Sequence, residues 1–187
     1  MAVKIGFKRR RTALTNYKHR LALVKSSLDR IVIRKTNRRI IAEVVHYEEK
    51  GDRVIKYLDS SALAAYKWPP RSNRATAYLV GILLAKTLSK TAGNKSEYIL
   101  DIGLSSPVKN SIPFMFAKGC TDGGLKLRSG IEVDEKVFGL TSEYAQKLKK
   151  ENEATYLKQF GGYLKGGFEP ASLNTLLNDV KEKILKE

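Results

Sequence analysis

Residues 30–47 of this 187-residue chain limit most strongly what it can fold into. Two β-branched runs, Ile31–Ile33 and Ile40–Val45, flank a short cationic segment, 34–39. Ile and Val favour strands, and Asn37 suits a turn because it tolerates positive φ and can hydrogen-bond the backbone. The pattern predicts a β-hairpin that holds out Arg34, Lys35, Arg38 and Arg39 together. A solvated turn without a partner would show the same local pattern, so the rest of the chain decides between these interpretations.

The positive charge of the chain is concentrated at its front. Residues 1–39 contain thirteen Lys or Arg and one Asp, a net charge of +12 out of +16 for the whole chain. Residues 40–131 add +5, whereas residues 132–187 have a net charge of −1. Charges crowded in this way repel one another unless a polyanionic partner neutralises them. The pI near 9.9 also favours a nucleic-acid-binding protein.

Composition excludes several other classes of protein. The chain is 42% apolar, enough for a packed core, and its longest apolar stretch, Leu79–Ala85, is too short for a membrane span. No apolar segment follows the cationic N-terminus, so no signal peptide is expected. The single cysteine, Cys120, excludes an internal disulfide and suits a reducing cytosol. Together with His19 and His46 it offers too few ligands for a zinc site, and we expect no metal or cofactor.

The order of the remaining elements predicts a mixed α/β fold. After the hairpin we expect a strand at 53–59, a short helix at 60–66 and a buried helix at 74–90 with Asn73 as N-cap. We then expect a strand at 97–103, a helix at 112–125, an irregular segment at 126–140, and helices at 141–150 and from Pro170 onward. This order predicts a three-stranded antiparallel meander followed by a β-α-β crossover, as in ribonuclease-H-like folds. The expected units are a basic arm (1–27), an α/β core (28–130) and a helical C-terminal extension (131–187).

Two aromatic residues near the cations allow two interpretations each. Leu14, Tyr17, Leu21 and Val24 fall at helical spacing, so Tyr17 either fastens a helix of the arm to the body or stacks on RNA bases. Trp68, the only tryptophan, lies near Arg71 and Arg74. It is either a core anchor beneath a loop or a stacking platform for RNA.

The sequence offers little support for catalysis. It contains no P-loop, Gly-x-Ser-x-Gly or His-Glu-x-x-His motif. A metal-dependent nuclease with the ribonuclease-H-like element order is the alternative, and it would require several carboxylates to converge on metal ions. The candidates are Glu43, Asp59, Asp101 and Asp122. A basic peripheral membrane protein is disfavoured because no basic amphipathic helix with bulky apolar anchors is present.

Several motifs in order along the chain resemble a known family. They are Phe7-Lys8-Arg9-Arg10-Arg11, Thr15-Asn16-Tyr17-Lys18-His19-Arg20-Leu21, Arg34-Lys35-Thr36-Asn37-Arg38, Tyr66-Lys67-Trp68, Ala77-Tyr78-Leu79-Val80-Gly81 and Leu100-Asp101-Ile102-Gly103-Leu104. In this combination they resemble the archaeal and eukaryotic branch of the ribosomal protein L-eighteen family. The sequence departs from that family's usual pattern at Leu28-Asp29, at Asn110–Pro113 and at Phe138–Thr141.

The resemblance implies a non-enzymatic constituent of the large ribosomal subunit in the cytoplasm. Such a protein would bind 5S rRNA and attach it to large-subunit rRNA in the central protuberance, beside the other 5S-binding protein, L-five, and without contact to a membrane. Cations of the arm and hairpin would neutralise phosphates, while other polar and aromatic residues would add hydrogen bonds and stacking. The expected RNA-binding set is Lys8, Arg9, Arg10, Arg11, Thr15, Asn16, Tyr17, Lys18, Arg20, Arg34, Lys35, Thr36, Asn37, Arg38, Arg39, Ser60, Ser61, Trp68, Arg71 and Arg74.

Overall fold

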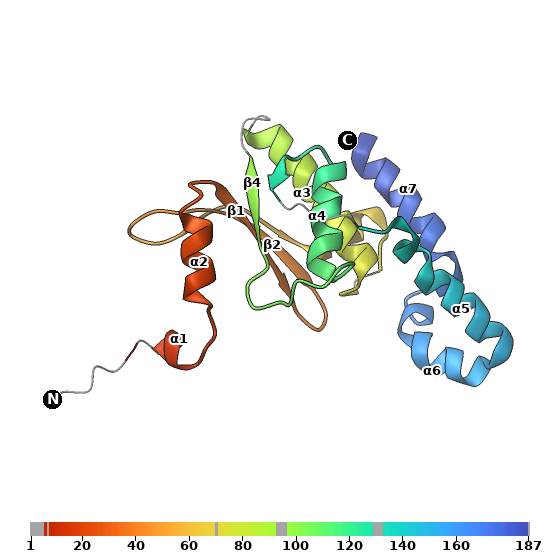
Figure 1. The fold of residues 1–187 in the computed structure, drawn as a ribbon. Helices are drawn as coiled ribbons and strands as arrows, with labels where there is room; N and C mark the ends of the chain where they lie inside the picture. Colours follow the sequence, from red (N-terminus) through yellow and green to blue (C-terminus); the bar gives the residue numbers. More distant parts are fainter. Residues whose placement is uncertain (1–5, 7, 70, 93–96, 129–132, 187) are drawn as a thin grey trace.

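A five-stranded mixed sheet organises the computed structural model, which describes residues 6, 8–69, 71–92, 97–128 and 133–186 (Figure 1). The strands lie in the order β3-β2-β1-β4-β5. They are β1 (Asp29–Lys35), β2 (Ile40–His46), β3 (Arg53–Asp59), β4 (Tyr98–Asp101) and β5 (Leu127–Arg128). The predicted mixed α/β class is confirmed, while assignment to the ribonuclease-H-like fold remains a prediction.

The strand pairing follows from the short connections at the front of the chain and the long one after β3. β1 pairs with β2, and β2 with β3, in antiparallel fashion, whereas β4 lies parallel to β1 on its other side. β4 is shorter than the predicted strand at 97–103, and β5 falls in a segment that we expected to be irregular. A two-residue strand leaves no periodic pattern in the sequence from which it could be predicted.

Helices cover the sheet and extend away from it. The helical elements are α1 (Lys8–Arg11), α2 (Tyr17–Val24), the 3₁₀ helix η1 (Ser60–Tyr66), α3 (Arg74–Ala92), α4 (Ile112–Asp122), the 3₁₀ helix η2 (Glu135–Phe138), α5 (Leu140–Glu151), α6 (Glu153–Leu164), the 3₁₀ helix η3 (Pro170–Ser172) and α7 (Leu173–Lys186). The predicted cap of α3 is confirmed, because the N–H of Thr76 donates to Asn73 Oδ1 at 2.8 Å.

One face of the sheet carries the main core. Ile31, Ile33 and Val44 point from it toward α3 and α4 and belong to one buried cluster with residues of both helices. α3 and α4 pack very closely where Gly81 meets Gly119, since a Cβ added at either glycine would collide with a backbone carbonyl of the facing helix. This close contact makes α3, α4 and the sheet a single packed unit.

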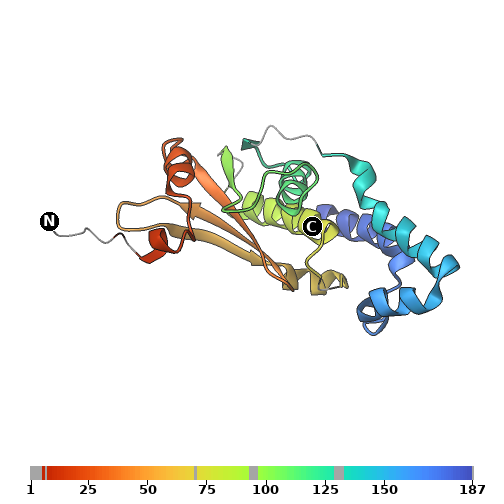
Figure 2. The same cartoon turned by 60° about the horizontal axis from the view of Figure 1, so that its bottom comes forward.

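The C-terminal helices divide between this core and a smaller one. α7 runs beside α3 (Figure 2) and contributes Leu177, Val180 and Ile184 to the main core. α5 and α6 lie at the end of the molecule opposite the N-terminal arm (Figure 1), around a separate cluster that includes Tyr156 and Phe160. The predicted C-terminal extension therefore includes a helix that braces the core.

Helix α6 was not expected from the sequence. It passes through Gly161 and Gly162, and each glycine inside a helix costs about 1 kcal/mol relative to alanine. Asn152 caps the helix by accepting a hydrogen bond from the N–H of Thr155 at 3.0 Å. Burial of Tyr156 and Phe160 adds apolar stabilisation that offsets the cost of the glycines.

Candidate nucleic-acid interface

The turn of the β1–β2 hairpin is built by Thr36. Its N–H and its hydroxyl both donate to the Arg39 carbonyl, at 2.8 and 2.9 Å, and its Oγ1 accepts from the Arg39 N–H at 2.9 Å. We predicted a longer cationic connection, 34–39, but β1 continues through Lys35, so Arg34 and Lys35 are strand residues. The turn proper is 36–39, and we call 34–39 the hairpin tip.

The cations of the hairpin tip are all exposed, but two of them are anchored. Arg34 forms an ion pair with Glu43 at 3.3 Å, and Arg39 forms one with Asp59 at 3.1 Å. The two arginine side chains are 61% and 62% exposed, whereas the side chains of Glu43 and Asp59 are only 19% and 12% exposed. The carboxylates thus hold the guanidiniums from behind and leave their outer edges in solvent. The charges were expected to project together, and the structure adds that two of them have fixed positions.

Asp59 is held in its charged form by several neighbours. Burial alone would raise the pKa of this carboxyl, but hydrogen bonds from the Ser61 N–H and from Arg39 outweigh burial and lower the pKa below its ordinary value of 3.8. The Ser61 N–H lies 2.8 Å from Asp59 Oδ1, so the same carboxylate caps η1. Asp59 therefore connects the hairpin tip to the first turn after the sheet.

The N-terminal arm differs from its predicted packing. Helix α2 begins at Tyr17 rather than at Leu14, with Asn16 as N-cap, its Oδ1 accepting from the His19 N–H at 3.1 Å. The expected apolar face is in solvent, with Leu14, Tyr17 and Leu21 exposed by 62%, 42% and 56%. Tyr17 therefore does not fasten α2 to the body of the protein. Lys8, Arg11 and Lys18 are also exposed, while the side chains of Arg9 and Arg10 lie outside the described part of the structure.

α2 is attached to the sheet by a chain of ion pairs. Arg20 lies 2.7 Å from Asp52, which also lies 2.7 Å from Arg30, and Arg30 lies 3.0 Å from Asp101. Arg30 is 3% exposed and was not among the predicted functional residues, and its place between two carboxylates was not predicted either. Arg20 was predicted to contact RNA, and the structure gives it a role in docking the arm.

The structure brings arm and hairpin residues together around one cavity of about 660 Å³. α2, the sheet and the segment 102–105 enclose it, on the sheet face opposite α3 and α4. Predicted RNA-binding residues line it together with carboxylates: Thr15, Asn16, Arg20, Arg34 and Lys35, with Glu43, Asp52 and Asp101. Arm and hairpin, separate in the sequence, therefore form one surface.

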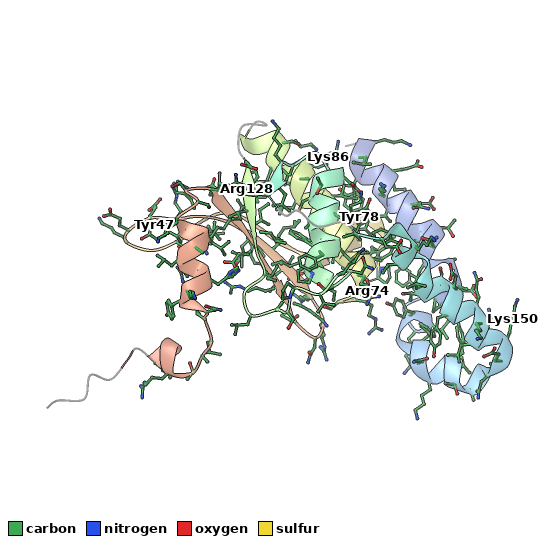
Figure 3. All side chains as sticks on the ribbon, viewed as in Figure 1. Tyr47, Arg74, Tyr78, Lys86, Arg128 and Lys150 are labelled. Atoms are coloured by element: carbon green, nitrogen blue, oxygen red, sulfur yellow. The ribbon has the colours of Figure 1, made fainter. Side chains whose placement is uncertain are left out.

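A second cavity, of about 450 Å³, joins the hairpin tip to the start of α3. Lys35 and Arg74 line it, together with Trp68 and Ser111, and its described lining includes no Asp or Glu. Figure 3 shows Arg74 at the first turn of α3. The cationic surface thus continues past the hairpin.

Two residues of the predicted RNA-binding set have buried side chains, so we do not retain them as side-chain contacts. Ser60 is 2% exposed, and its hydroxyl oxygen accepts from the Ile40 N–H at 3.2 Å. Trp68 is also 2% exposed, and its indole N–H donates to Thr76 Oγ1 at 2.8 Å, which makes it the core anchor and not a stacking platform. Both residues are engaged inside the protein. Ser61 remains exposed, and Arg71 is exposed with its guanidinium 5.2 Å from the centre of the Tyr163 ring.

The carboxylates required by the nuclease alternative are engaged separately. Glu43 and Asp59 hold the two anchored arginines, and Asp101 pairs with Arg30 and accepts from the Gly103 N–H at 2.9 Å. Asp122 accepts from the Tyr78 hydroxyl at 2.7 Å on a different helix. Among the described residues, no three His, Cys, Asp or Glu side chains come together in a way that could hold a metal ion.

A search for membrane spans over the same residues finds no helix with the length and apolar character needed to cross a bilayer.

Fold and surface together define a basic α/β protein that presents arginines and lysines from an arm, a hairpin and a helix start. The family model described as "Ribosomal large subunit proteins 60S L5, and 50S L18" matches residues 2–98, which is more than half of the chain. The chain therefore belongs to this family of large-subunit ribosomal proteins. The match includes the arm, the first three strands and α3, so it covers nearly all of the candidate interface.

Proposed function

We propose that this protein binds 5S rRNA and attaches it to large-subunit rRNA in the central protuberance of the cytoplasmic ribosome. The role is structural and not enzymatic, as expected from its family. The observation that carries the proposal is the set of lysines and arginines that α2, the hairpin tip and the start of α3 present around two cavities, which share Lys35 in their linings. Surfaces of this kind neutralise the phosphates of structured RNA.

The proposed contacts are the predicted residues whose described side chains remain accessible, together with Arg9 and Arg10, whose side chains lie outside the described structure. Lysines and arginines would meet phosphates, and the polar and aromatic side chains of the arm and turn would contact riboses or bases. The set is Lys8, Arg9, Arg10, Arg11, Thr15, Asn16, Tyr17, Lys18, Arg34, Lys35, Thr36, Asn37, Arg38, Arg39, Ser61, Arg71 and Arg74. Arg20 supports it by fixing α2 to the sheet at Asp52.

The proposal assigns a different role to each of three parts of the chain. Residues 1–27 would be the RNA-binding arm, 28–130 the core that positions it, and 131–187 an extension that supports the core and faces neighbouring ribosomal proteins such as L-five. The near-neutral charge of residues 132–187 supports an assignment away from RNA.

A gel-shift titration tests this function directly. The full chain is titrated against 5S rRNA and against an unrelated structured RNA of similar length, at several salt concentrations. With six to ten phosphates contacted, affinity should fall by roughly 10³- to 10⁵-fold between about 50 and 200 mM salt. We expect 5S rRNA to bind more tightly than the unrelated RNA at every salt concentration. Equal affinity for both RNAs would contradict the proposal.

A further inference from the structure

Part of the sheet face beside the hairpin tip is left uncovered. Residues directly opposite each other in antiparallel strands share a face, and the register pairs Arg34 with Ile41, Ile41 with Asp59, and Glu43 with Tyr57. The ion pair between Arg34 and Glu43 joins these residues into one group on the face that α2 partly covers. The adjoining residues Ile33, Ala42 and Leu58 face the main core instead.

Tyr57 is the aromatic residue of this uncovered face. It lies in the middle of β3 and is 52% exposed, and β3 is the edge strand of the sheet. Among the described residues, Tyr57 belongs to neither of the two buried clusters, so the core does not account for an aromatic side chain here. Its cross-strand partner, Glu43, forms an ion pair with Arg34. Asp59, on the same face of β3, forms an ion pair with Arg39.

The outer layer of this face combines an aromatic ring with guanidinium groups. The side chains of Glu43 and Asp59 are mostly buried, while those of Arg34 and Arg39 are more than half exposed. An apolar protein partner would have to remove water from both guanidiniums, at an energetic cost. A nucleotide offers each group a favourable contact, because bases stack on tyrosine rings and phosphates pair with arginine.

We propose that Tyr57 is a stacking platform for an unpaired base of the bound RNA, with Arg34 and Arg39 contacting the phosphates that flank this base. The site is continuous with the hairpin tip, since Arg39 is the last residue of the turn. It rests on the proposed RNA-binding function and extends it, because the expected interface contained no residue of β3. The platform would add recognition of a single-stranded position to the charge-based contacts of the arm and turn.

The test compares two exposed tyrosines at different places on the sheet. The variants are Tyr57→Ala, Tyr57→Phe and, as the matched control, Tyr47→Ala. Tyr47 is 48% exposed and follows β2 at the end of the strand away from the hairpin tip (Figure 3). Urea unfolding of each variant checks that it folds, and substitutions at these exposed positions should leave the unfolding midpoint close to that of the parent chain.

Affinity for 5S rRNA should separate these variants. Tyr57→Ala should weaken binding by about 5- to 150-fold, the range for loss of one base–aromatic stack. It should leave the salt dependence unchanged because no charge is lost. Tyr57→Phe, which keeps the ring, and Tyr47→Ala should bind like the parent chain. The proposal is overturned if Tyr57→Ala binds as tightly as Tyr47→Ala, or if Tyr57→Phe loses as much affinity as Tyr57→Ala.

A second probe distinguishes failure of the platform from failure of the proposed function. A short unstructured RNA carrying 2-aminopurine reports stacking directly, because the fluorescence of this base is quenched when it stacks. Quenching should occur with the parent chain and with Tyr57→Phe, and be lost with Tyr57→Ala. If the parent chain does not prefer 5S rRNA but this pattern holds, the platform stands and the 5S assignment fails. Quenching as strong in Tyr57→Ala as in the parent chain refutes the platform whichever RNA the protein prefers.

Discussion

The hairpin tip and the C-terminal helices both carry many lysines or arginines but use them differently. In the tip, the carboxylate partners of Arg34 and Arg39 lie beneath the guanidiniums and the cations face outward. In the C-terminal helices the acids are themselves at the surface, as in the pair Lys149–Glu169, at 2.6 Å, with both side chains about half exposed. The number of cations therefore does not distinguish the two regions, and we infer that the placement of their partners marks the proposed RNA surface.

The two regions also differ in what their apolar residues do. α2 leaves Leu14, Tyr17 and Leu21 in solvent, whereas α7 buries Val180 and Ile184 completely in the main core. From this contrast we infer that the front of the chain forms contacts with a partner and that the C-terminal helix contributes to stability. The predictions below test that contrast, beginning with the largest expected effect.

Truncation of Ile184 should strongly destabilise the protein. Ile184 is 0% exposed, and replacing a buried isoleucine by alanine costs roughly 2–5 kcal/mol through lost burial and the cavity that remains. We expect Ile184→Ala to lower the free energy of unfolding by that amount in urea titrations followed by Trp68 fluorescence. The control, Leu157→Ala on α6, removes a side chain that is 53% exposed and should change it by about 0.5 kcal/mol or less. Similar losses in both variants would show that α7 does not brace the core.

Removal of the Asp59 carboxylate should have a smaller effect that depends on pH. Asp59→Ala loses the cap of η1, which costs about 0.5–2 kcal/mol, whereas Asp59→Asn keeps an oxygen acceptor for the Ser61 N–H. Because the folded state lowers the pKa of Asp59, its charged form stabilises the protein above pH 3.8, and this contribution is lost as pH falls through the lower folded pKa. Urea titrations from pH 7 to 2.5 should therefore show less acid sensitivity in Asp59→Asn than in the parent chain. An unchanged acid dependence would contradict the role of this ion pair.

The smallest effect is expected for the fluorescence of Trp68, which RNA binding should leave unchanged. Its indole is buried and bonded to Thr76, so bound RNA cannot stack on it. Saturating 5S rRNA should leave the position of its emission maximum and its acrylamide quenching unchanged. Strong static quenching of this fluorescence on complex formation would place RNA against the indole and reverse the assignment made from the structure.

Helices and strands with a regular pattern of apolar residues could be predicted from the sequence, whereas those without a clear pattern could not. The β-branched runs of β1 and β2 and the apolar length of α3 are strong local patterns, and their elements were predicted closely. α6 has apolar residues at helical spacing, Tyr156, Phe160 and Leu164, but Gly161 and Gly162 lie among them and disfavour a helix, and part of its packing comes from α5. β5 is too short to leave a pattern at all.

The candidate site was predictable in charge but not in geometry. The excess of cations marks the front of the chain, yet the sequence does not show that Arg30 is buried between two carboxylates. Ser60 and Trp68 lie beside exposed residues in the sequence, and only the three-dimensional packing shows them to be buried. Tyr57 was missed because its position on the uncovered face depends on strand register, which is a property of the assembled sheet.

The salt dependence of RNA binding in two double variants tests the central claim most directly. One variant combines Arg34→Ala with Arg38→Ala in the hairpin tip, and the other combines Lys147→Ala with Lys149→Ala in α5, which removes the same number of cations. We predict that the tip variant binds 5S rRNA more weakly and that the slope of log affinity against log salt falls by about two, one for each lost phosphate contact. The α5 variant should match the parent chain in both quantities. Equal losses of affinity and slope in the two variants would contradict the account.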